Sequence, residues 1–85
     1  MIPKAMNSLE ELLRFLSELE KRKISYGIEH NRSESVMVLV AVPGERLEVE
    51  FFADGSIEVE TFGNSCGVKN TSMSELLGRL EPHAS

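Results

Sequence analysis

The stretch from Val36 to Phe62, VMVLVAVPGERLEVEFFADGSIEVETF, most constrains what this chain can fold into. It contains three runs in which apolar residues alternate with other residues, and two turn signals join the runs. Period-2 alternation is typical of half-buried strands. Asp-Gly between two such runs is typical of a hairpin. We therefore predict three consecutive antiparallel strands, with the rest of the chain covering the sheet.

The length of the second hairpin loop follows from the pattern of the flanking residues. A two-residue loop at Asp54-Gly55 would place Phe51 opposite Glu58, although directly opposed residues share one face of a sheet. A three-residue loop, residues 53–55, places Phe51 opposite Ile57 instead. This loop is a type I turn with Gly55 in the left-handed region, which forms a G1 bulge. Gly55 is therefore expected to resist replacement, because other residues would be strained there.

The same register places Glu50 opposite Glu58, and Glu48 opposite Glu60. Directly opposed like charges destabilise a sheet by about 0.2–1 kcal/mol per pair. Two interpretations stay open: a solvated surface of an acidic protein, or an acidic platform for a basic partner. The candidate partner-binding residues are the four carboxylates and the aromatic residues next to them: Glu48, Glu50, Glu58, Glu60, Phe52 and Phe62.

The first hairpin turns at Pro43-Gly44, a pair that suits a type II turn because glycine supplies the positive φ. Whether the loop has two or four residues, the valines of residues 36–42 share the face of Leu47. The residues between them, Met37, Leu39 and Ala41, then share the face of the glutamates. A strand that is apolar on both faces is typical of a central strand.

Two capping boxes predict a helix at each end of the chain. Ser8-Leu9-Glu10-Glu11 precedes leucines at helical spacing and predicts a helix over residues 8–22. Ser72-Met73-Ser74-Glu75 predicts a second helix over residues 72–81, which Pro82 ends. Gly78 costs about 1 kcal/mol inside a helix, so we expect close packing there.

The remaining segments are a strand and a loop. Residues 24–30 form a predicted first strand with Ile24, Tyr26 and Ile28 on the core side, and Gly27 indicates a bulge or a close approach. Residues 63–70 are rich in glycine and asparagine and predict a loop. Cys66 in this loop is expected to be an unreactive free cysteine, because no base lies near it in sequence.

The predicted fold is a single domain, residues 1–85, of the α+β class. It is a four-stranded antiparallel meander with an N-terminal helix and a short C-terminal helix, in the order α-β-β-β-β-α. We favour both helices on the valine face, which leaves the acidic face open as a binding surface or a homodimer contact. Alternatively, the second helix covers Met37 and Leu39.

Composition limits the function classes. The net charge of −5 argues against nucleic acid as a partner. A single cysteine excludes an intramolecular disulfide and fits a reducing, cytoplasmic setting. No apolar run is long enough for a membrane span. Because no metal-ligand spacing, nucleophile–base set or phosphate loop is found, we expect no enzyme activity, no catalytic or metal-binding residues and no cofactor.

The segment PGERLEVEFFADGSIEVETF, residues 43–62, resembles a group of small, mostly uncharacterised bacterial proteins. These proteins share an opening helix followed by hairpins of the pattern PGERxEVEFFxDGxxEVExF, and some are similar to immunity proteins of polymorphic toxin systems. The resemblance covers residues 12–63 and omits the Cys66 loop and the second helix. It implies a non-catalytic protein that binds and neutralises a toxin. A basic toxin would fit the acidic face, and a structural homodimer without a ligand of its own is the alternative.

Overall fold

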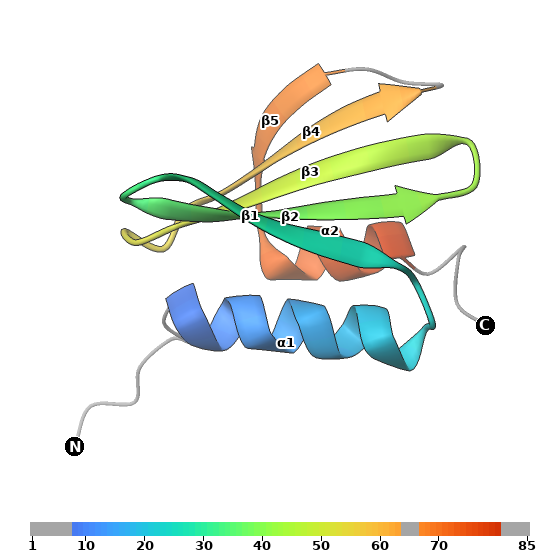
Figure 1. Ribbon diagram of the computed structural model, residues 1–85, viewed down its shortest axis with the longest axis horizontal. Coiled ribbons are helices and arrows are strands. Elements are labelled where there is room, and N and C mark those ends of the chain that lie inside the picture. The colour runs from blue at the N-terminus through green and yellow to red at the C-terminus, as the bar shows by residue number, and fades with distance from the viewer. Residues whose placement is uncertain (1–7, 64–66, 81–85) are drawn as a thin grey trace.

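A computed structural model describes residues 8–63 and 67–80. Five antiparallel strands form one sheet in chain order, and both helices lie on the same side of it (Figure 1). The elements are α1 Ser8–Lys21, β1 Tyr26–Arg32, β2 Ser35–Val42, β3 Glu45–Phe52, β4 Ile57–Gly63, β5 Gly67–Thr71 and α2 Met73–Leu80. The predicted α+β class, the meander and the helix at each end are confirmed.

The sheet has a fifth strand where the sequence predicted a loop. β5 pairs with β4 from Ile57 opposite Thr71 to Thr61 opposite Gly67. The prediction of a loop over residues 63–70 is therefore wrong for its second half. The backbone of β4 offers a row of pairing groups, and tertiary pairing of this kind overrides a low strand propensity. The expectation for Cys66 falls on residues 64–66, outside those that the structure describes.

The three-residue loop between β3 and β4 is confirmed. Phe51 lies opposite Ile57, and Glu50 lies opposite Glu58. The N–H of Gly55 donates to the Phe52 carbonyl at 3.0 Å, and Gly55 has a φ of 94°. The hydroxyl and the backbone N–H of Ser56 donate hydrogen bonds to the Asp54 carboxyl, and these bonds fix the loop further. They also hold the pKa of that carboxyl below its usual value.

The hairpin between β2 and β3 closes with two residues. Val42 lies opposite Glu45, and Gly44 takes a φ of 86°, as a type II turn requires. Val36 lies opposite Phe51 and Val38 opposite Val49, so the predicted apolar face is confirmed.

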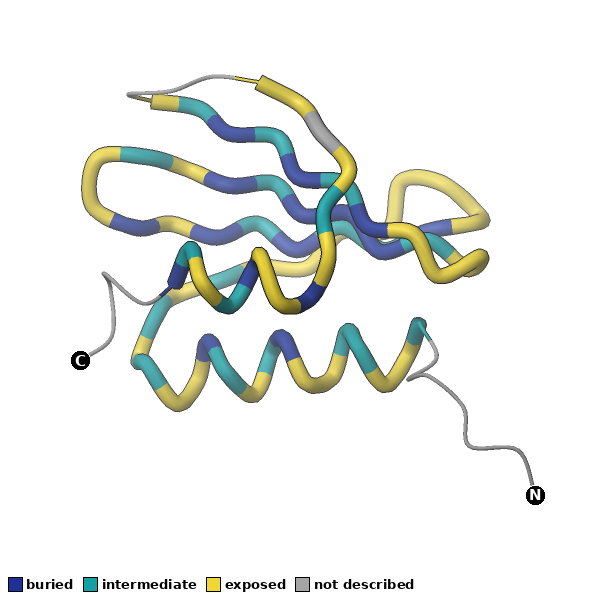
Figure 2. Tube along the Cα trace, turned by 180° about the vertical axis from the view of Figure 1, so that it is seen from behind, coloured by how far each residue is buried: buried dark blue, intermediate teal, exposed yellow. Residues whose placement is uncertain are grey.

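The core lies between this face and the two helices (Figure 2). The ring of Phe15 in α1 lies 5.5 Å from the ring of Phe51 in β3. Leu76 and Leu80 of α2 are fully buried in the same cluster. The favoured arrangement, with both helices on one side, is confirmed. Its counterpart, a second helix over Met37 and Leu39, is excluded.

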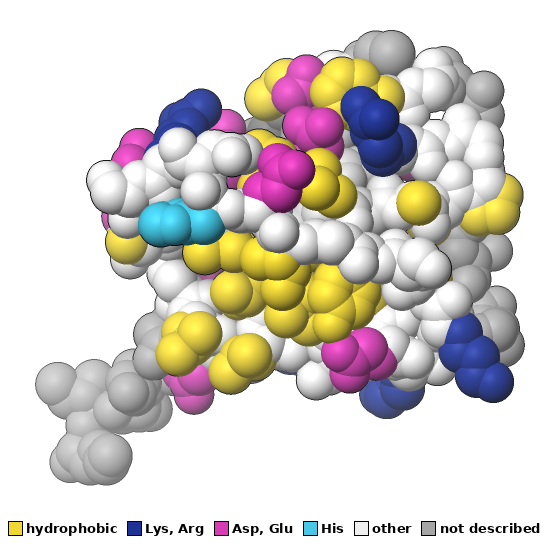
Figure 3. All heavy atoms as spheres, in the orientation of Figure 1, with side chains coloured by type: hydrophobic (Ala, Val, Ile, Leu, Met, Phe, Trp, Pro, Cys, Tyr) yellow, Lys and Arg dark blue, Asp and Glu magenta, His cyan; other side chains and the backbone are white. Residues whose placement is uncertain are grey.

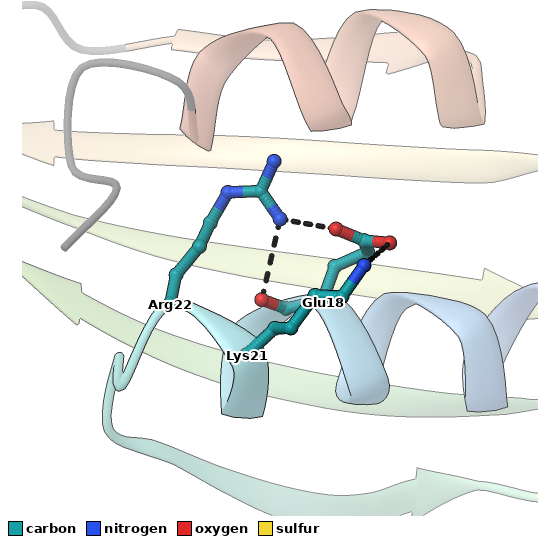
Figure 4. A network of polar contacts seen from close by, with 3 residues as sticks. All are labelled: Glu18, Lys21 and Arg22. Atoms are coloured by element: carbon teal, nitrogen blue, oxygen red, sulfur yellow. Dashed lines mark hydrogen bonds and ion pairs between the residues drawn. The ribbon is translucent and has the colours of Figure 1, made fainter.

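Polar contacts stabilise the C-terminal end of α1 and tie α2 to the sheet. Figure 4 shows Glu18 and Arg22 on the flank of α1 that faces α2, with Lys21 beside them. The Arg22 guanidinium lowers the pKa of the Glu18 carboxyl. Arg79 of α2 donates to Glu45 and to Thr61, both at 3.1 Å. These contacts tie α2 to the sheet on the side opposite the glutamate row.

Two glycine predictions are wrong. A methyl group at Gly27 would lie 3.9 Å from the Leu39 side chain, which is an ordinary contact. The strand irregularity lies instead between Glu29 and Arg32. A methyl group at Gly78 would meet no atom within 4 Å, so this helix position is open rather than closely packed.

We predict that Gly63→Ala destabilises the fold by about 1–3 kcal/mol. Gly63 has a φ of 129°, and an added Cβ would lie 2.5 Å from the Gly44 carbonyl oxygen. Urea unfolding measures the effect. The control is Gly78→Ala, which we expect to stabilise by about 0.4–1 kcal/mol. Equal unfolding midpoints for wild type and Gly63→Ala would contradict this account.

Candidate functional site on the acidic face of the sheet

The register brings the four predicted glutamates together on the face that the helices leave uncovered. They line one shallow depression of about 30 Å³ together with two apolar side chains. The lining residues are Met37, Glu48, Glu50, Glu58, Glu60 and Val68. We call this set the acidic depression.

Glu50 already has polar partners within the fold. It is only 7% exposed, although it is ionisable. The hydroxyl of Ser35 donates to its carboxylate, and the Nε of Arg32 lies 3.5 Å from it. A buried carboxylate needs such partners because its desolvation is costly. Glu50 therefore lines the depression but is already engaged by Ser35 and Arg32.

Arginines flank the depression at both ends. Arg46 lies 3.6 Å from the Glu48 carboxylate, and its guanidinium lies 4.8 Å from the centre of the Phe62 ring. At the other end, the Arg32 guanidinium lies 5.9 Å from the centre of the Phe52 ring. Each predicted aromatic residue, Phe52 and Phe62, is thus already in cation–π contact with an arginine of the same chain. This leaves less of each ring for a partner.

Glu58 and Glu60 differ from the other two glutamates. Both are half-buried, and neither has an ion-pair partner among the side chains that the structure describes. On β5, Asn70 lies opposite Glu58, and Val68 lies opposite Glu60. The pair is therefore enclosed between two strands, where water screens its charge less than at an edge.

Sequence reasoning missed Ser35, Arg32, Arg46 and Val68. Arg46 had a usable signal, because it alternates in phase with Glu48 along β3. Arg32 had none, because the irregularity that follows Glu29 changes which residue lies opposite Ser35. Val68 was missed because its strand was predicted as a loop.

The described residues contain no group of three or more His, Cys, Asp or Glu side chains arranged to hold a metal ion. The four glutamates stand on regular strands, without the wrapped loop that hard cations use in proteins. In the same described ranges, no helix combines the length and the apolar character needed to cross a bilayer.

A second hollow lies on the other side of the sheet, between α1 and the turn from β1 to β2. It has a volume of about 240 Å³ and a mainly apolar lining that includes Leu12, Val36 and Phe51. Figure 3 shows hydrophobic side chains gathered between α1 and β1. Leu9 is 62% exposed and Ile28 is 52% exposed. Ile28 faces the core side, as predicted, but nothing in the described residues covers it fully.

No family model matches this chain, and no similar protein was found among curated proteins or solved structures. The resemblance of residues 12–63 to small, mostly uncharacterised bacterial proteins, some of them similar to immunity proteins, stays a prediction. The function of the acidic depression therefore has to be argued from its geometry.

We predict that Ser35→Ala destabilises the fold by about 1–3 kcal/mol, because it removes a hydrogen bond from a buried carboxylate. Chemical unfolding of the purified variant measures this loss. Ser33→Ala is the matched control, since Ser33 is exposed and lies in the adjacent turn. A loss of equal size in both variants would show that the Glu50 contact contributes nothing.

Replacing Glu58 and Glu60 together by glutamine should stabilise the fold. Each lies directly opposite a glutamate on the neighbouring strand β3, and each like-charged pair costs about 0.2–1 kcal/mol. The gain should shrink at high salt because salt screens the repulsion. Thermal unfolding at two salt concentrations measures it. A less stable double variant would mean that these carboxylates hold contacts within the fold.

Proposed function

We propose that this chain is a non-catalytic, acidic protein-binding module that binds a basic partner at Glu58 and Glu60. One observation carries the proposal: two half-buried carboxylates lie side by side, without an ion-pair partner among the described side chains. Each also faces a like charge. A cation from another protein would relieve this repulsion on binding.

The dimensions of the acidic depression favour a side chain over a small-molecule ligand. A volume of about 30 Å³ is far below the roughly 300–1,000 Å³ of small-molecule pockets. A lysine ammonium is compact and offers three donors to surrounding carboxylates. Met37 and Val68 can contact the apolar stem of the same side chain.

The flanking arginines limit the shape of the partner. Arg32 and Arg46 lie at opposite ends of the row and would repel a broad, uniformly basic surface. A narrow basic segment, with one or two lysines at its centre, would avoid both. The proposed partner therefore presents an isolated basic protrusion rather than a nucleic-acid-binding groove.

Immunity to a toxin is the setting that best fits the proposed partner. The net charge of −5 steers a basic protein toward this chain and speeds association. The resemblance of residues 12–63 adds a bacterial, cytoplasmic immunity-type role to this proposal. A basic toxin encoded near this chain's gene would be the partner.

The alternative of a structural homodimer through the same face is less favourable. A two-fold contact there would bring together the carboxylates of both copies. These include Glu58 and Glu60, which have no ion-pair partner among the described side chains. Opposed like charges of this kind weaken an interface.

The test uses purified basic proteins encoded next to this gene, titrated calorimetrically at low and moderate salt. We expect one of them to bind wild type and to bind more weakly as salt rises. Glu58→Lys/Glu60→Lys should lower the affinity at least about tenfold, since it replaces attraction with repulsion.

The matched control is Glu10→Lys/Glu75→Lys, which makes the same charge change on the helices. Both positions are exposed, and both helices lie on the opposite side of the sheet. If the two double variants lost affinity equally, the net charge of the chain, and not the acidic depression, would account for binding. A partner that binds the sheet variant as tightly as wild type would overturn the proposal.

A further inference from the structure

β1 is an open edge of the sheet. It is the outermost strand, and six of its seven residues are exposed. Natural proteins usually protect such an edge with lysine, proline or a bulge. β1 contains neither lysine nor proline, and its irregularity begins only after Glu29. Residues 26–29 therefore form a regular edge in which Glu29 is the one charged side chain.

The structure indicates which backbone groups of this edge are free to pair. The N–H of Ala41 donates to the Ser25 carbonyl at 3.4 Å, so Ser25 and Ala41 form a hydrogen-bonded pair of opposed residues. Hydrogen-bonded and non-hydrogen-bonded pairs alternate along antiparallel strands. Gly27 and Glu29 consequently bond to β2, whereas the N–H and C=O groups of Tyr26 and Ile28 point away from the sheet.

Exposed apolar surface continues from this edge toward α1. Ile28 on β1 and Leu9 and Leu13 on α1 are each more than half exposed. Figure 3 shows hydrophobic side chains gathered between these two elements. A partner that pairs with β1 would shield these side chains as well as satisfy the free backbone groups.

We propose that the occupant of this edge is a second copy of the same chain, paired antiparallel with β1 about a two-fold axis at Ile28. Ile28 then lies opposite Ile28 of the second copy, and Tyr26 opposite its His30. Gly27 lies opposite the other Glu29, so no like charges face each other. The outward backbone groups of Ile28 are those that this register requires.

The neighbouring register is disfavoured on two grounds. An axis at Glu29 would place two glutamates directly opposite each other, at a cost of about 0.2–1 kcal/mol. It would also use the N–H and C=O of Glu29, which are engaged with β2. An axis at Tyr26 would also use outward backbone groups, but it would place Ile28 opposite Ile24, which lies outside β1. We therefore assign the axis to Ile28, about which residues 26–30 of β1 pair with one another.

Charge at the ends of the strand supports the same arrangement. Antiparallel pairing brings the turn before β1, which contains Lys23, next to the turn after β1 of the other copy, which contains Glu34. Both side chains are exposed. Opposite charges therefore meet twice, once at each end of the interface.

The size of the interface sets the expected strength. A standard interface buries about 800 Å² per partner, which is about 15% of the 5414 Å² surface of this chain. One strand edge and one helix flank supply less than that, so we expect a dissociation constant of micromolar order. The acidic depression lies on the sheet face and stays open in this dimer, so the inference goes beyond the proposed function.

Sedimentation velocity of the full chain from about 1 to about 500 μM tests the dimer over the expected range. Ile28→Lys should raise the dissociation constant at least about tenfold, because it places two cations at the axis. Ser74→Lys is the control, since Ser74 is exposed on α2, which follows the opposite edge strand of the sheet. It should leave the dimer intact.

Charge exchange provides a second test that does not change the apolar surface. Lys23→Glu and Glu34→Lys should each weaken the dimer, and the combined variant should restore it. A wild-type chain that is monomeric at the highest concentration would overturn the proposal. So would dissociation by Ser74→Lys, or a combined variant as weak as the single ones.

Discussion

The three-residue loop at Gly55 is the constraint on which the rest of this structure depends. A slip of one residue in a strand pair moves every side chain to the opposite face. The loop therefore decides that Phe51 meets Ile57 and closes the core beneath β3 and β4. The same choice stacks Glu50 against Glu58 on the other face. The acidic row is the unavoidable counterpart of the apolar one.

The sequence was informative wherever the two faces of a strand differ in polarity. Alternation around Phe51 and Val49 allowed the register of the central strands to be derived correctly. β5 could not be found this way, because Gly67, Val68 and Asn70 alternate weakly and pair only because β4 offers them a partner. The pairing of Arg32 with buried Glu50 was equally hidden, since it depends on an irregular strand end.

The distribution of apolar surface is the other difference from expectation. Met37 and Leu39 were expected to form an open strip, yet both are half-buried. Among the described residues, the exposed large apolar side chains are Leu9 and Leu13 on α1, Ile28 on β1 and Val68 on β5. The reason is the position of α1: Phe15 directs it toward Phe51 of β3, so the helix does not cover the outer strand. The two candidate surfaces are therefore separate and can act independently.

Because every strand pairs with its neighbour in the chain, the sheet can assemble by successive short loop closures, each of which costs little entropy. Topologies of this kind are expected to form quickly. The helices, however, come from opposite ends of the described chain, so their shared core closes last. During synthesis the strands can pair while the surface around Leu47 and Thr61 still faces water, until α2 emerges and docks through Arg79. In that interval the apolar surface of the nascent sheet is exposed and therefore prone to aggregation.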